Sequence, residues 1–128
     1  MPKRANSAFT IDRRDATPAA WEGGDMSRTR WTKTFTGQLA GSSVVEAVML
    51  KLHDAGPAVY VGVERFNCTL DGRRGTFVLL HAGTALGDDH SASWTIVPGS
   101  GTGELAGIRG HGEITPRHDF VLDYELDS

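Results

Sequence analysis

Cysteine, excess charge of one sign and long apolar runs are all scarce in this sequence, and each shortage excludes a class of protein. The 128 residues include one cysteine, Cys68, so no disulfide can form within the chain, which fits a reducing compartment. Lys and Arg number 13 against 16 Asp and Glu, and no basic stripe exists that would predict nucleic-acid binding. No apolar run approaches the ~20 residues that span a bilayer, and residues 1–14 lack the apolar core of a secretory signal. We therefore expect a cytoplasmic protein that binds neither nucleic acid nor membrane.

Glycine is abundant instead, with 16 residues, and short alternating segments favour an all-β domain. Residues 28–36 alternate along a strand, with Trp31, Lys33 and Phe35 on one face. Residues 59–70 alternate as well, and Asp71-Gly72 is a strong hairpin signal before the next strand. Strands recur about every ten residues, which is typical of a barrel or sandwich. The length predicts one domain over residues 1–128, of which residues 1–7 are expected to be disordered.

Residues 42–52 fit two secondary structures. Val44, Val45, Val48 and their neighbours recur at helical spacing, and Ser43 with Glu46 forms a capping box. An α+β domain with one helix at about 42–52 is therefore the alternative fold. Valine also permits a strand, in which Val44, Glu46 and Val48 would share one face.

Three stretches of the sequence resemble a known family. They are VGVER at residues 61–65, GTFVLLH at 75–81 and SWTIVPGSGTGEL at 93–105. They are similar to a bacterial family of small domains of unknown function that is grouped with allene oxide cyclase-like barrels. The resemblance extends from about residue 8 to residue 126, and it implies a single antiparallel eight-stranded barrel with a strand at 42–52. It implies no established activity, although related barrels include cofactor-free cyclases of hydrophobic substrates.

Glu64 and His81 are the candidate catalytic residues, because each lies among residues of core type on its strand. If Asp71-Gly72 forms a two-residue turn, Glu64 faces Leu79 and His81 faces Gly62 across the hairpin. Glu64 and His81 are then diagonal neighbours on one face. A carboxylate beside an imidazole in an apolar cavity can move a proton on a ligand without a cofactor. Such a pair can also do no more than satisfy its own hydrogen bonds and fix the register.

The first functional hypothesis is a barrel that holds a hydrophobic small molecule with a few polar groups. The first alternative is a cofactor-free isomerase or cyclase that uses Glu64 and His81 as acid and base. The second is a structural domain whose outer strand faces join copies into a homo-oligomer. No metal is expected from the histidine spacing, and the glycine-rich run at 101–106 lacks the helix of a dinucleotide site. The residues expected to line the interior and bind the ligand are Glu46, Tyr60, Phe66, Phe77, Trp94 and Tyr124.

Overall fold

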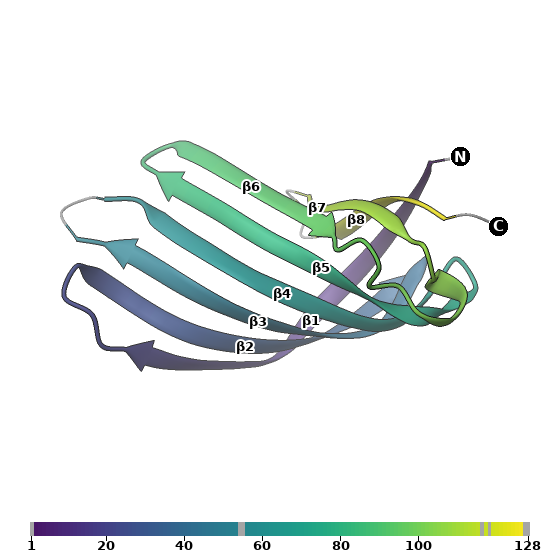
Figure 1. Cartoon of the computed structure of the whole chain (residues 1–128), viewed down its shortest axis with the longest axis horizontal. Coiled ribbons are helices and arrows are strands. Elements are labelled where there is room, and N and C mark those ends of the chain that lie inside the picture. The colour runs from purple at the N-terminus through teal and green to yellow at the C-terminus, as the bar shows by residue number, and fades with distance from the viewer. Residues whose placement is uncertain (1, 54–55, 116, 118, 127–128) are drawn as a thin grey trace.

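In a computed structural model, the chain forms a closed barrel of eight antiparallel strands in sequence order (Figure 1). The structure describes residues 2–53, 56–115, 117 and 119–126. The all-β eight-stranded barrel expected from the sequence is confirmed. None of the described residues belongs to a helix long and apolar enough to cross a membrane. The strands are β1 (Lys3–Ala19), β2 (Gly24–Gly37), β3 (Leu39–Leu52), β4 (Ala58–Leu70), β5 (Arg73–Leu86), β6 (Asp89–Ile96), β7 (Arg109–Ile114) and β8 (Asp119–Glu125), with one 3₁₀ turn, η1 (Gly103–Leu105), before β7.

The alternative of a helix at 42–52 is wrong, since these residues belong to β3. This strand pairs along its length with β2 on one side and β4 on the other, so Val45 faces both Trp31 and Glu64. Two complete ladders satisfy the backbone groups of β3, which outweighs one capping box. Glu46, the presumed cap partner, instead lies 3.4 Å from Arg30 on the outer surface.

The expectation of disorder at residues 1–7 is wrong for residues 3–7, while Met1 lies outside the described residues. Residues 3–8 pair with residues 119–124 of β8 and close the barrel. Ala5 and Ser7 are buried in the wall. On the outside, Arg4 forms an ion pair with Asp123, with 2.8 Å between Nε and Oδ1. The segment is polar in composition, but Ala5 and Ser7 are small and buried while Arg4 is on the outside. This alternation is that of a strand in a barrel wall.

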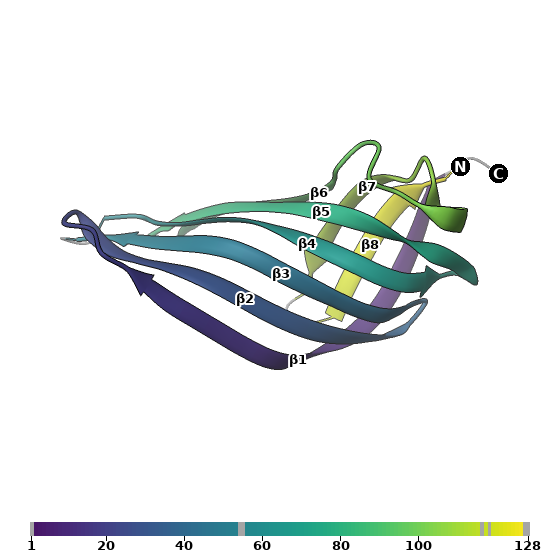
Figure 2. The same cartoon turned by 60° about the horizontal axis from the view of Figure 1, so that its bottom comes forward.

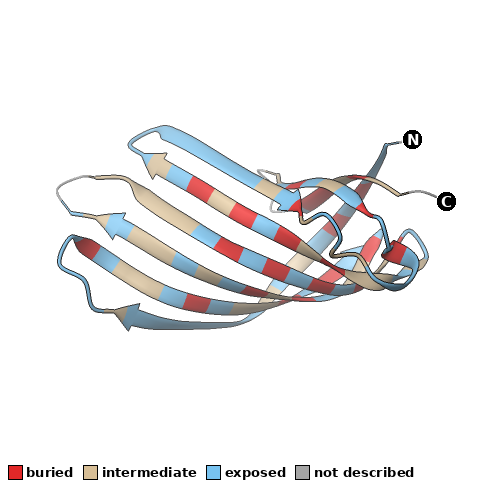
Figure 3. Cartoon of the chain, viewed as in Figure 1, coloured by how far each residue is buried: buried red, intermediate tan, exposed pale blue. Residues whose placement is uncertain are grey.

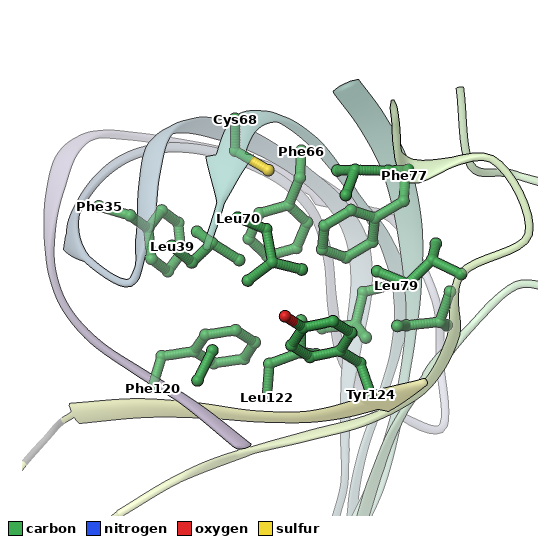
Figure 4. Close-up of a cluster of buried hydrophobic side chains, with 14 residues drawn as sticks. Phe35, Leu39, Phe66, Cys68, Leu70, Phe77, Leu79, Phe120, Leu122 and Tyr124 are labelled. Carbon is green, nitrogen blue, oxygen red and sulfur yellow. The ribbon is translucent and has the colours of Figure 1, made fainter. Parts of the chain in front are cut away.

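A hydrophobic core fills the end of the barrel at which β7 and β8 lie, here called the closed end (Figure 3). Its centre is aromatic, and the Phe66 and Phe77 rings stack with their centroids 4.7 Å apart (Figure 4). Leu105 of η1 and nearby Ile108 are fully buried in the same core. The loop after β6 therefore contributes to the packing of this end.

The opposite end of the barrel, here called the open end, lacks a wall on one side. There β1 to β6 extend beyond β7 and β8 (Figures 1 and 2). Among the described residues, only Trp94 and Thr95 of β6 pair with β7, and only residues 3–8 of β1 pair with β8. The inner face of the long strands is therefore accessible from this end.

Candidate functional site

The β4–β5 hairpin brings Glu64 and His81 together with the register expected from the sequence. Glu64 faces Leu79, and Gly62 faces His81. The turn residues at 71 and 72 have φ of 48° and 84°, as the left-handed turn of a two-residue hairpin requires. His81 Nε2 lies 2.7 Å from Glu64 Oε1. The diagonal contact predicted between the two side chains is present.

Glu64 lies at the centre of a buried polar cluster to which four adjacent strands each contribute one residue. The cluster consists of Lys33 on β2, Ser43 on β3, Glu64 on β4 and His81 on β5, and all four are buried. Ser43 Oγ donates a hydrogen bond to Glu64 Oε2 at 2.5 Å. Lys33 Nζ forms an ion pair with the same oxygen at 3.5 Å. Each carboxylate oxygen therefore has a partner inside the barrel.

The cluster keeps Glu64 ionised. Burial raises its pKa, but the His81 hydrogen bond, the Lys33 charge and the Ser43 hydroxyl together lower it below the ordinary value of 4.5. An ionised carboxylate only accepts hydrogen bonds, so the Nε2–H group of His81 donates to Glu64. The carboxylate therefore fixes the orientation and tautomer of the ring. In the neutral imidazole, Nδ1 carries the lone pair, and no described residue is hydrogen-bonded to it.

A cavity of about 210 Å³ adjoins this cluster on the side of the open end. Lys33 lines the cavity, and its Nζ lies 3.5 Å from Glu64 Oε2 and 5.0 Å from the centre of the Phe9 ring. Trp94 Nε1 is buried and has no hydrogen bond of normal geometry to a described residue, although the Tyr60 phenol is its polar neighbour. Burial raises the pKa of the Tyr60 phenol, and hydrogen bonding with the neighbouring Trp94 side chain partly opposes this rise. The cavity is lined by Trp31, Lys33, Val45, Ala47, Met49, Tyr60, His81, Trp94 and Ile114.

Two glycines beside His81 let neighbouring side chains pack closely against the backbone of β4 and β5. Gly62 faces both Ala47 and His81 on the neighbouring strands. A Cβ at Gly62 would lie 2.6 Å from the Ala47 Cβ, so no side chain fits there. A Cβ at Gly83 would lie 2.3 Å from the Tyr60 ring, which therefore rests against bare backbone. Gly83 therefore allows the Tyr60 ring, which lines the cavity, to pack against the β5 backbone.

A larger trough of about 750 Å³ lies along the inner face at the open end. It shares Met49 and Tyr60 with the cavity, so the two spaces adjoin. Trp21, which is 44% exposed, contributes to its lining from the β1–β2 connection. Most of the other lining residues are small or apolar. Asp25 and Lys51 are the two charged residues among the described residues of the lining.

Four of the eight predicted site residues surround the cavity. His81, Tyr60 and Trp94 line it, and Glu64 contacts His81 from the closed side. The aromatic residues Phe66, Phe77 and Tyr124 lie in the hydrophobic core instead (Figure 4). Their burial there excludes them from the lining of the cavity.

The expectation that Glu46 lines the interior is wrong. Its side chain is 52% exposed on the outer surface, 3.4 Å from Arg30 and 3.9 Å from Arg65. The register of β3 turns Val45 and Ala47 inward, so the residue between them must face outward. Glu46 therefore has no contact with the cavity.

Two members of the cluster, Lys33 and Ser43, are not among the residues predicted from the sequence. The signal for Lys33 is its position between Trp31 and Phe35 on a face that is otherwise aromatic. A lysine on such a face is buried only when it is paired. Ser43 has a competing interpretation as a helix cap. Among the described residues, no three His, Cys, Asp or Glu side chains gather as metal ligands.

Comparisons with known proteins give a family and a fold. Residues 5–127 match the family described as a protein of unknown function (DUF3224). The chain is similar to a crystal structure from the same family, that of a protein with unknown function from Shewanella oneidensis MR-1. The two are 27% identical and superpose with a TM-score of 0.85, and the match covers 100% of this chain and 99% of that chain. No curated protein matches the chain. The grouping with allene oxide cyclase-like barrels stays a prediction, while the match over almost the full length shows that the chain belongs to the DUF3224 family.

Proposed function

We propose that this protein binds an elongated and mostly apolar small molecule, whose polar end reaches the cavity beside His81. The observation that carries the proposal is the adjoining pair of spaces, about 750 and 210 Å³, that extends from the open end to the buried polar cluster. Ligand sites typically combine an apolar lining with a few convergent polar groups. The trough supplies the lining, and His81, Lys33 and Trp94 supply the polar groups.

The contrast between the two ends of the barrel supports binding over a purely structural role. Protein interiors pack with few voids larger than a water molecule, and the closed end follows this rule with fully buried Phe66, Leu79 and Leu122. Near the open end, the large rings of Trp31 and Tyr60 line a space instead of filling it. Ala47, which also lines this space, has too small a side chain to fill it.

Binding can be tested with the apolar dye Nile red, whose emission rises when it leaves water. The wild type should bind the dye saturably. Ala47→Phe, which places a ring in the cavity, should weaken binding by at least roughly ten-fold, a loss of about 1.4 kcal/mol. Val48→Phe is the matched control, because this neighbouring residue is 38% exposed and β3 alternation turns it to the outer face.

Circular dichroism and the thermal midpoint check that each variant keeps its fold. Failure of the wild type to bind the dye contradicts the proposal, and so does equal binding by the two variants. Native mass spectrometry of protein purified from its own host gives a second readout. We expect a bound apolar molecule that is depleted in Ala47→Phe.

A further inference from the structure

We propose, on the basis of the binding function above, that this site enolises a neutral carbonyl compound. His81 Nδ1 takes the proton from the carbon beside the carbonyl, and Lys33 donates a hydrogen bond to the carbonyl oxygen. Both side chains line the same cavity. The substrate class is an apolar ketone or aldehyde with at least one C–H bond beside the carbonyl.

The unused donors in the cavity determine the kind of polar group that fits. The Lys33 ammonium has three N–H groups and one ion-pair partner, Glu64 Oε2 at 3.5 Å, and the buried Trp94 Nε1–H has no hydrogen bond of normal geometry to a described residue. A buried donor without an acceptor costs free energy, so an acceptor on the ligand would be stabilising there. A carbonyl oxygen has two lone pairs and no proton, which suits two donors.

Charge favours a neutral ligand over a carboxylate. The Glu64 carboxylate and the Lys33 ammonium already balance each other at 3.5 Å, with exposures of 1% and 5%. A ligand carboxylate would add a second, uncompensated negative charge to the buried site, at considerable cost. A ketone adds none, and it still accepts hydrogen bonds from the donors.

The proton transfer conserves atoms and charge within the site. The C–H bond breaks, its electron pair forms a carbon–carbon double bond, and the carbonyl π pair moves onto oxygen. His81 Nδ1 receives the proton, so an imidazolium and an enolate form together. Glu64, which is 2.7 Å from the opposite ring nitrogen, stabilises the imidazolium, and Lys33 stabilises the enolate oxygen. When the proton held at His81 Nδ1 exchanges with solvent D₂O and a deuteron is delivered to the same carbon, the ketone gains deuterium; delivery to another carbon of a conjugated carbonyl shifts a double bond.

The test follows deuterium exchange of 2-octanone in D₂O by proton NMR. The signals of the protons beside the carbonyl should disappear faster with the wild type than in buffer alone. His81→Gln, which removes the base, should reduce this acceleration by about 10²-fold or more. Lys33→Met should reduce it by about 10²-fold. Val48→Phe on the outer face should exchange the ketone as fast as the wild type.

Nile red binding by each variant shows whether the site is intact, and it separates this proposal from the binding function. A wild type that binds dye but gives no exchange above buffer overturns enolisation and leaves binding in place. Exchange that survives in His81→Gln also overturns the proposal. If either cluster variant fails to fold, Ala47→Phe provides the decision, because blocking the cavity should abolish exchange. If Ala47→Phe exchanges the ketone as fast as the wild type, the reaction does not take place in this cavity, and the proposal is overturned.

Discussion

Replacement of Glu64 by glutamine should destabilise the barrel by about 3–5 kcal/mol, the usual result of breaking a buried ion pair from one side. Glutamine keeps the shape of the side chain, so the main loss is the negative charge opposite Lys33. The Lys33 side chain is 5% exposed, and its Nζ lies 3.5 Å from the carboxylate. At that distance, the Coulomb attraction is about 5 kcal/mol with an effective dielectric constant of about 20. Both values predict a large loss of stability when one carboxylate oxygen is replaced by an amide nitrogen.

Urea unfolding, followed by the fluorescence of the three tryptophans, measures this loss. The double variant Glu64→Gln/Lys33→Met is the informative control, because it removes the cation that the single change leaves without a counter-ion. It should be more stable than Glu64→Gln, with a coupling between the two sites of about 0.5–3 kcal/mol. A cost below about 1 kcal/mol for Glu64→Gln, or simple additivity of the two changes, would refute the buried-pair reasoning.

The same carboxylate links stability to pH. Because folding lowers the pKa of Glu64 below its ordinary value of 4.5, its contribution is present above that pH and is lost as the pH falls through the folded pKa. Below about pH 4.5, the wild type should therefore lose stability more steeply than Glu64→Gln. Thermal unfolding of both proteins over this range tests the sign, and parallel curves contradict it.

Three further predictions concern the core and the backbone. Burial raises the pKa of the Cys68 thiol to about 11, so a thiol reagent at about pH 8 should label Cys68 only as the protein unfolds. Immediate labelling of the native protein would contradict this prediction. Phe66→Ala removes a ring stacked on Phe77 and should cost about 3–5 kcal/mol in urea unfolding, whereas a loss below about 2 kcal/mol would show that the core collapses around the gap. Gly110→Ala should lower the thermal midpoint more than Gly72→Ala. A Cβ at position 110 would lie 2.0 Å from a carbonyl oxygen of β8, whereas a Cβ at position 72 would have nothing within 4 Å. Equal shifts of the midpoint would contradict the steric reasoning.

The hairpin part of the site could be predicted because its local signals agree. Asp71-Gly72 suits the two-residue turn, and that turn sets the pairing of every residue along β4 and β5. A period of two then fixes which residues share a face. The contact between Glu64 and His81 therefore follows from sequence alone. Their burial also follows, because Phe66 and Leu79 lie on the same face.

β3 could not be oriented in the same way, because both of its faces carry apolar residues. Val45 and Met49 face the lumen, while Val48 is 38% exposed on the outside. Alternation alone therefore cannot tell which face is buried. The orientation depends on the ladders to β2 and β4, and it leaves Glu46 on the surface. The strand itself needs the same ladders, since its local pattern also suits a helix.

Long-range pairing explains the remaining differences from the sequence-based expectations. Residues 3–8 form a strand because they pair with residues 119–124, at the other end of the chain. Lys33 is buried because its counter-ion, Glu64, lies two strands away on β4. Neither partner is visible in the local sequence around the residue concerned. Lysine is almost never fully buried unless it is paired, so the partner must be known before the burial can be inferred.

Strand length, more than the composition of the lumen, determines where the site lies. β7 and β8 contain 6 and 7 residues, against 14 in each of β2 and β5. At about 3.4 Å per residue, the short strands wall off only about half the length of the long ones. Trp94 is at the limit of that wall, because it faces His81 on β5 and Gly112 on β7. In the part of the chain that the structure describes, the preceding residues of β6 pair only with β5. The polar cluster therefore lies between the packed core and the open end. Its charged side chains are buried, while His81 lines the cavity beside it.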